Sequence, residues 1–213
     1  MKNLTTLLTL TCLLVLSIQV KAQNNNHFSI KGGVNFSQLS NEVNGLESKN
    51  RTGFHLGATY NVYLNNIRLQ PGLVFVQRGG KLELSNELQR AINNNNTAEF
   101  KLNYLDIPLN VSVKIANLSS NNDGLYLFVE PTASICLSGK LKEAGESKDL
   151  NIGSDNTDNI KAFDFGVKLG ASIKIGSFEP YIGYNFGLTN INNDDSKVKN
   201  KGLYLGLAVA LGK

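Results

Sequence analysis

The sequence of 213 residues predicts an all-β fold, an eight-stranded antiparallel up-and-down transmembrane β-barrel. Three observations predict it: eight runs of alternating apolar and polar residues, links that alternate between long and short, and an apolar leader typical of exported proteins. Alternation with period two indicates strands with two unlike faces. An even number of such strands can close into a ring, and closure leaves no sheet edge unpaired in lipid.

Residues 1–22 are expected to form a secretory signal peptide. Met1-Lys2-Asn3 is a short positive start, Leu4 to Leu16 is an apolar core, and Val20-Lys21-Ala22 places small residues where cleavage is expected. The alternative is a membrane-anchoring helix, but the apolar core is shorter than the roughly 20 residues that a spanning helix needs. The predicted division is therefore a signal peptide over residues 1–22 and an outer-membrane β-barrel domain over residues 23–213.

The first three runs cover residues 28–37, 53–64 and 67–78. Each sets large apolar side chains at every second position against polar or small ones. Their apolar faces hold Phe28, Ile30, Val34 and Phe36; Phe54, Leu56, Ala58, Tyr60, Val62 and Leu64; and Ile67, Leu69, Leu73 and Phe75. We expect three antiparallel strands, with a tight two-residue turn at Asn65-Asn66 between the second and the third.

The fourth run, residues 100–113, changes phase in its middle. Phe100, Leu102 and Tyr104 share one face, whereas the next apolar positions fall on the other face, at Leu105, Ile107, Leu109, Val111 and Val113. A one-residue slip of this kind predicts a β-bulge inside the strand. The fifth run, residues 125–138, has the apolar positions Leu125, Leu127, Val129, Ala133, Ile135 and Leu137.

The last three runs cover residues 163–175, 178–188 and 203–212. Their apolar positions are Phe163, Phe165, Val167, Leu169, Ala171, Ile173 and Ile175; Phe178, Ile182, Tyr184, Phe186 and Leu188; and Leu203, Leu205, Leu207, Val209 and Leu211. Gly176-Ser177 predicts a second two-residue hairpin turn. We therefore expect eight strands in all, with both chain ends on the side of the short turns.

Long and short links alternate between the runs. Residues 41–51, 79–96 and 139–159 are long and polar, whereas the link over residues 117–124 is of intermediate length. Outer-membrane barrels have short turns on the periplasmic side and longer loops outside. The pattern therefore predicts an exported protein in the bacterial outer membrane.

The composition of the polar face decides between a membrane barrel and a soluble one. A soluble lipocalin-like barrel would turn its apolar face inward, around a ligand. Here the polar face is rich in Gly, Ala, Ser and Thr, which suit the crowded interior of a barrel of eight strands. The apolar face continues over about nine to eleven residues in each strand, enough to cross a bilayer at a tilt. The membrane barrel is the preferred prediction, and the soluble barrel is the alternative.

Several segments resemble the PorT-like outer membrane β-barrel family of Bacteroidetes. They are Ile30–Ser37, Gly53–Gly57, Leu69–Phe75, Tyr104–Leu109, Leu137–Lys140 and Asp164–Gly170. The resemblance covers about residues 27 to 211 and implies a barrel fold and an outer-membrane location. That family is named for a component linked to type IX secretion, although most members have no assigned role. It therefore implies one further alternative, an accessory part of a secretion machine.

The side chains available for chemistry are few. The chain has two histidines, His27 and His55, and beyond the leader one cysteine, Cys136, which is too few for a zinc site of His/Cys type. Phosphate loops and dinucleotide fingerprints are missing from the sequence. Without the leader, 19 basic residues face 17 acidic ones and form no basic run, which argues against nucleic acid. We expect no catalytic, cofactor or metal site.

His55 is the one residue that suggests an enzyme as an alternative. It falls on the polar face, near the outer end of the second run, where a nearby Asp and Ser would complete a nucleophilic set. The simpler interpretation is a histidine hydrogen-bonded to its neighbours in the lumen or at its rim. We prefer this second interpretation.

Charged residues on the polar faces are expected to point into the lumen. They are Lys31, Arg68, Asp106, Lys114, Glu130, Asp164 and Lys168. Because a buried charge without a partner costs several kcal/mol, these groups should pair in a network that fills the barrel. A narrow polar pore is the alternative, although a ring of eight strands leaves little room for one.

The functional prediction is a non-enzymatic envelope or binding protein. Its partners would be outer-membrane lipid and a protein bound through the long outer loops or the periplasmic turns. The secretion-machine role and the His55 enzyme are the alternatives.

Overall fold

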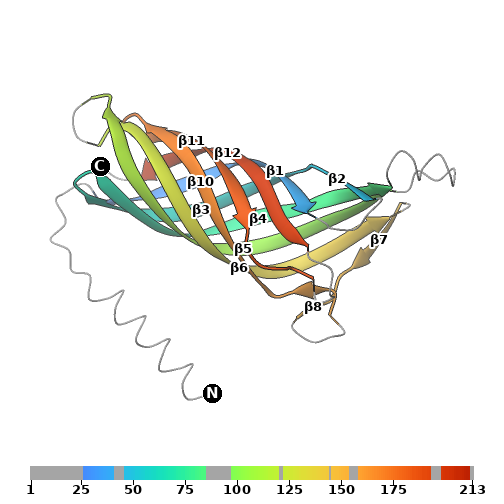
Figure 1. The fold of residues 1–213 in the computed structure, drawn as a ribbon. Coiled ribbons are helices and arrows are strands. Elements are labelled where there is room, and N and C mark those ends of the chain that lie inside the picture. The colour runs from blue at the N-terminus through green and yellow to red at the C-terminus, as the bar shows by residue number, and fades with distance from the viewer. Residues whose placement is uncertain are drawn as a thin grey trace, which may run out of the picture.

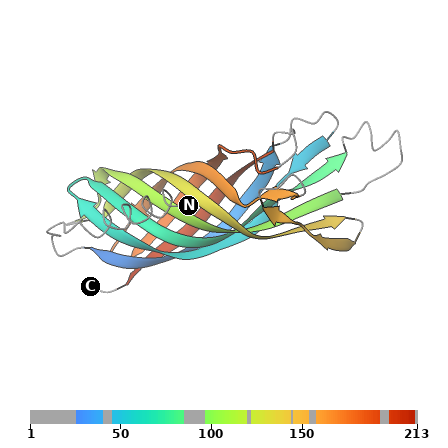
Figure 2. The same ribbon diagram turned by 90° about the horizontal axis from the view of Figure 1, so that it is seen from below.

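The computed structural model describes residues 26–40, 46–84, 97–119, 122–143, 145–153, 158–192 and 198–211. Eight long strands form a closed antiparallel ring (Figures 1 and 2). In ring order they are β1 (His27–Ser40), β3 (Arg51–Leu64), β4 (Ile67–Leu84), β5 (Thr97–Asn117), β6 (Gly124–Glu143), β10 (Phe163–Lys174), β11 (Phe178–Gly187) and β12 (Lys199–Leu211). Strand β12 pairs with β1, and β6 pairs with β10, so the predicted fold class is confirmed.

Three short strands lie within segments that the sequence predicted as links, and a fourth follows the last of these segments. The three are β2 (Leu46–Lys49), β7 (Glu146–Asp149) and β8 (Ile152–Gly153), and the fourth is β9 (Ile160–Lys161). Strand β2 pairs with the far end of β4, and β7 pairs with the far end of β6. The prediction of continuous loops over residues 41–51 and 139–159 was therefore wrong in part, because backbone pairing continues into both.

One end of the barrel carries the short turns. Asn65 and Gly176 each begin a two-residue turn and have φ angles of 56° and 57°, in the left-handed region that Asn and Gly tolerate best. The start of β1 and the end of β12 lie at the same end, because His27 pairs with Asn61 of β3 and Phe28 with Leu211. Short turns and chain ends mark this end as periplasmic.

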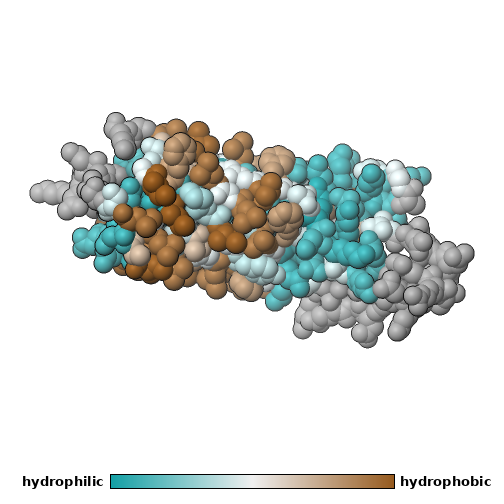
Figure 3. All heavy atoms as spheres, turned by 90° about the horizontal axis from the view of Figure 1, so that it is seen from above, coloured by the Kyte–Doolittle hydropathy of each residue, from teal (hydrophilic) through white to brown (hydrophobic). Residues whose placement is uncertain are grey.

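The large apolar side chains point outward around the ring. Exposed examples come from every long strand, such as Phe28, Phe54, Leu73, Ile107, Leu127, Leu169, Ile182 and Leu207. They form a band next to the periplasmic end, followed by a hydrophilic part of the wall (Figure 3). An apolar surface of this extent is unsuited to water and suits a bilayer. The soluble barrel with an inward apolar face was therefore the wrong alternative. We call the band the apolar belt.

The predicted bulge in the fourth run has a different explanation. Along β5, Leu102, Tyr104, Asp106 and Pro108 are all buried, so the alternation of the backbone continues unbroken. A register shift does occur beside Asn103 and Tyr104, but the extra residue is Leu137 on β6. The apolar side chains change from one face of β5 to the other because the surroundings change. From Leu105 toward the periplasmic end, the outer face meets lipid. From Tyr104 toward the outer end, the inner face meets an apolar core.

That core closes the lumen at its outer end. It contains the buried residues Leu39, Leu102, Tyr104, Cys136, Ile160 and Ile191, with Phe100, Leu150, Ile152 and Val198 packed against them. Two backbone hydrogen bonds hold segments of this core in place. The Leu150 N–H donates to the Gly139 carbonyl at 2.9 Å, and the Lys161 N–H donates to the Ile191 carbonyl at 2.8 Å. We call this cluster the outer plug.

The barrel wall is higher on one side than on the other. Strands β4, β5 and β6 have 18, 21 and 20 residues, whereas β10, β11 and β12 have 12, 10 and 13. The long strands, with β2 and β7 at their margins, extend beyond the apolar belt (Figure 1). We call the sheet of β2, β4, β5, β6 and β7 beyond the belt the projecting sheet. In the part of the chain that the structure describes, no helix is long and apolar enough to cross a membrane.

Candidate functional site

The lumen holds its charges in three layers, of which the lowest lies near the periplasmic end. Arg68 on β4 donates two hydrogen bonds to Glu179 on β11, at 2.7 Å and 2.5 Å. Ser172 also donates to Glu179, at 2.6 Å, and the Arg68 guanidinium lies 4.3 Å from the centre of the Tyr126 ring. Arginine binds a carboxylate best in this two-bond geometry, and it also stacks on aromatic faces. The pair therefore crosslinks two strands that are not neighbours in the ring.

Glu130 on β6 is the centre of the middle layer. Its carboxylate accepts hydrogen bonds from Lys168 at 2.5 Å, Asn110 at 3.0 Å and Lys31 at 3.3 Å. Lys168 lies directly opposite Glu130 on the adjacent strand β10, whereas Lys31 reaches it from β1. Because two ammonium groups share one carboxylate, this layer carries one excess positive charge.

The upper layer has an excess of one negative charge. Arg78 on β4 pairs with Asp106, lies 3.7 Å from Asp164, and donates to the Tyr204 hydroxyl at 2.9 Å. Asn200 donates to Asp164 Oδ2, the same oxygen that faces Arg78, at 2.9 Å. One guanidinium therefore faces two carboxylates, which offsets the charge of the middle layer.

The structure confirms the inward direction of the predicted lumen charges. Lys31, Arg68, Asp106, Lys114, Glu130, Asp164 and Lys168 lie on the inner faces of their strands. The sequence placed Arg78 and Glu179 on polar faces, but the prediction did not include them among the interior charges. The available signal was their alternation with outward apolar residues, Arg78 with Phe75 and Glu179 with Phe178.

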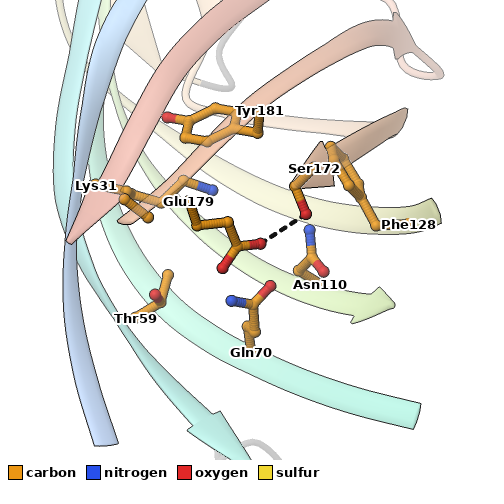
Figure 4. A pocket seen from close by; sticks show the side chains of 9 residues that line it. Lys31, Thr59, Gln70, Asn110, Phe128, Ser172, Glu179 and Tyr181 are labelled. Atoms are coloured by element: carbon orange, nitrogen blue, oxygen red, sulfur yellow. Dashed lines mark hydrogen bonds between the residues drawn. The ribbon is translucent and has the colours of Figure 1, made fainter. Parts of the chain in front are cut away.

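Little space remains between these layers. One cavity of about 20 Å³ lies among Lys31, Thr59, Gln70, Asn110, Ser172 and Glu179 (Figure 4). A second, of about 10 Å³, lies between the middle and the upper layer, beside Lys31, His55, Asp106, Glu130 and Tyr204. Each has room for about one water molecule. Within the described residues, the interior is a filled core of ion pairs under the outer plug.

His55 lies deep in the lumen, where its side chain is 3% exposed. It is the fifth residue of β3, counted from the outer end of the strand, and it lies between the middle and the upper layer. Its Nε2 atom lies 2.5 Å from the Tyr181 hydroxyl, and its ring packs against Tyr204 with 5.4 Å between ring centres. The partner of the imidazole is therefore a tyrosine and not a serine, and the outer plug lies between it and the cell exterior. This geometry favours the interpretation of a hydrogen-bonded lumen histidine.

Metal-ligating side chains are scattered. Among the described residues, no group of three or more His, Cys, Asp or Glu is arranged to hold a metal ion. Cys136 belongs to the outer plug and is buried with a free thiol.

Comparison with known proteins gives the same architecture. A family model described as an outer membrane protein beta-barrel domain matches residues 21–193. The chain belongs to this outer-membrane β-barrel family. Membership places the protein in the bacterial outer membrane, with lipid around the apolar belt.

Solved structures of outer-membrane barrels are also similar. Neisserial surface protein A (NspA) is 12% identical, with a TM-score of 0.52 over 86% of this chain and 97% of NspA. Ail, the attachment invasion locus protein of Yersinia pestis, is 17% identical, with a TM-score of 0.49 over 87% of this chain and 99% of Ail. The likeness to NspA shows the fold alone. No curated protein matches the sequence of the present chain.

Proposed function

We propose that this protein is a non-enzymatic outer-membrane barrel whose closed body anchors the projecting sheet, and that this sheet and the outer loops are its binding part. The single observation that carries the proposal is the contrast between the two regions. The lumen is filled by ion pairs and covered by the outer plug, whereas the strands β4, β5 and β6 extend well beyond the belt. A body without a passage and with an extended outer sheet suits binding better than transport.

The absence of conduction is the first expected outcome. The mature protein, inserted in a planar lipid bilayer, should give no single-channel steps, because the ion-pair layers and the plug leave cavities for about one water each. A barrel of more strands that is known to conduct serves as the positive control. Regular steps that scale with the protein added would contradict the proposal and favour the narrow polar pore.

Export with cleavage is a separate proposal. We expect the mature protein in outer-membrane fractions to begin at Gln23, because Ala22 ends a signal-like leader. Mass spectrometry of the intact purified protein checks it, and Ala22→Arg is the variant expected to block processing. A purified membrane form that retains residues 1–22 would contradict it.

The secretion-machine role rests only on the resemblance of this sequence to the PorT-like family of Bacteroidetes. A pull-down of the tagged protein from membranes distinguishes it from a self-sufficient binding protein. Large, stoichiometric envelope partners would favour the machine. Binding only to molecules at the outer loops or the periplasmic turns would favour the function proposed above.

A further inference from the structure

Among the described residues, outward-facing lysines are confined to one end of the barrel. Lys49, Lys81, Lys101, Lys140 and Lys142 share the outer face of the projecting sheet, and Lys199 and Lys201 share the outer face of β12. At the periplasmic end, the basic side chains among the described residues, Arg68, Lys114 and Lys174, all point into the lumen. We call the seven outward lysines the lysine rim.

The inner members of the lysine rim lie within reach of the lipid headgroups. Lys201 is two residues beyond Leu203, and Lys101 is four residues beyond Leu105, the outermost belt residue of β5. Two residues of a strand span about 5 Å along the membrane normal at the tilt of such barrels, and four residues span about 10 Å. The headgroup layer extends about 5–8 Å beyond the hydrocarbon. Lys201 therefore lies within this layer, and the Lys101 side chain reaches it by bending back toward the bilayer.

Four lysines of the rim lack a counter-charge from the protein. Lys101, Lys142, Lys199 and Lys201 have no ion-pair partner within the described part of the chain. Two nearby acids are already engaged, since Glu83 pairs with Lys49, and Glu99 pairs with Arg51 at 3.1 Å. The rim thus presents uncompensated positive charge to its surroundings.

One pair within the rim is unfavourable by itself. Lys101 lies directly opposite Lys140 on the adjacent strand. Like charges in directly opposite positions destabilise a sheet, and the exposed Asp149, 3.5 Å from Lys140, offsets little of this repulsion. An external anion between the two ammonium groups would remove the repulsion.

We propose that the lysine rim binds the phosphate groups of anionic lipids in the outer leaflet of the membrane. The continuity of the rim with the apolar belt commits the site to a lipid and not to a soluble anion. The lipid phosphates would supply the counter-charge that the protein lacks at Lys101 and Lys140. This site is independent of any partner of the outer loops.

The test uses the refolded mature protein in phosphatidylcholine nanodiscs with a small fraction of phosphatidic acid. Enrichment of phosphatidic acid around the barrel is measured with a spin-labelled analogue. Lys101→Gln/Lys140→Gln should weaken the preference for phosphatidic acid by about 25-fold, because each lysine near an anionic lipid surface contributes about fivefold. The matched control Lys148→Gln/Lys161→Gln removes the same charge from two lysines outside the rim, one on β7 and one on β9. The control should change the preference less than about twofold.

Three results would overturn the proposal. An equal loss in both double variants would show that net charge alone attracts the lipid. An unchanged preference in Lys101→Gln/Lys140→Gln would show that the rim binds no phosphate. Binding of inorganic pyrophosphate to the detergent-solubilised protein as tight as that of phosphatidic acid would show a site for soluble anions. The unboiled gel mobility of every variant verifies that the barrel has folded.

Discussion

Arg78→Met is expected to lower the free energy of unfolding by about 3–5 kcal/mol, the usual cost of removing one partner from a buried ion pair. Arg78 is the one guanidinium between Asp106 and Asp164, and its side chain is 3% exposed. Without it, two carboxylates remain in the lumen with no facing cation in their layer. Because the chain has no tryptophan, unfolding in urea is best followed by the loss of the fast-migrating form on unboiled gels.

Two further variants show whether the loss comes from uncompensated charge. Arg78→Met/Asp106→Asn should recover part of the stability, because it removes one of the two unpaired carboxylates. Lys148→Met, which removes an exposed lysine of β7, should change stability by no more than about 0.5 kcal/mol. A loss below about 1 kcal/mol for Arg78→Met would mean that the upper layer does not stabilise the barrel.

Leu169→Arg is expected to destabilise the barrel in lipid by about 2–4 kcal/mol, the cost of arginine near the middle of a bilayer. Leu169 is 46% exposed and lies midway along the belt positions of β10. Its guanidinium would have to leave water for hydrocarbon. Urea-dependent unfolding from phosphatidylcholine vesicles measures the effect.

The position of the substitution provides the control. Gln77→Arg places the same side chain on the outer face of β4 beyond the belt, where the cost should be about 0–1 kcal/mol. Equal costs at Leu169 and Gln77 would show that the belt does not define the membrane boundary.

The strands and their faces were predictable because one physical contrast governs most of the chain. Lipid outside and ion pairs inside force period-two alternation, which is visible in residues such as Phe163 to Ile173. The same contrast misled the interpretation of β5. Beyond Tyr104 the outer face meets water and the inner face meets the outer plug, so an unbroken strand imitates a bulge.

The pairing of the lumen charges could not be predicted from the sequence. Glu130 and Lys168 are direct neighbours across two paired strands, but their register is set only when the ring closes. Arg68 and Glu179 belong to β4 and β11, which are not neighbours in the ring, so no local pattern connects them. The short strands β2 and β7 were missed because each has only four residues, mostly polar, and shows no apolar alternation that would distinguish it from a loop.

The direction of each face is the central claim, and site-directed spin labelling along β10 tests it most directly. In protein that comprises residues 23–213, Cys136→Ser removes the one cysteine, and single cysteines at successive positions from Phe163 to Ile173 then carry a nitroxide in vesicles. The structure predicts high accessibility to oxygen, which partitions into lipid, at Phe165, Val167, Leu169 and Ala171, and low accessibility at the positions between them. Accessibility without a period of two, or with the two faces exchanged, would contradict the membrane barrel described here.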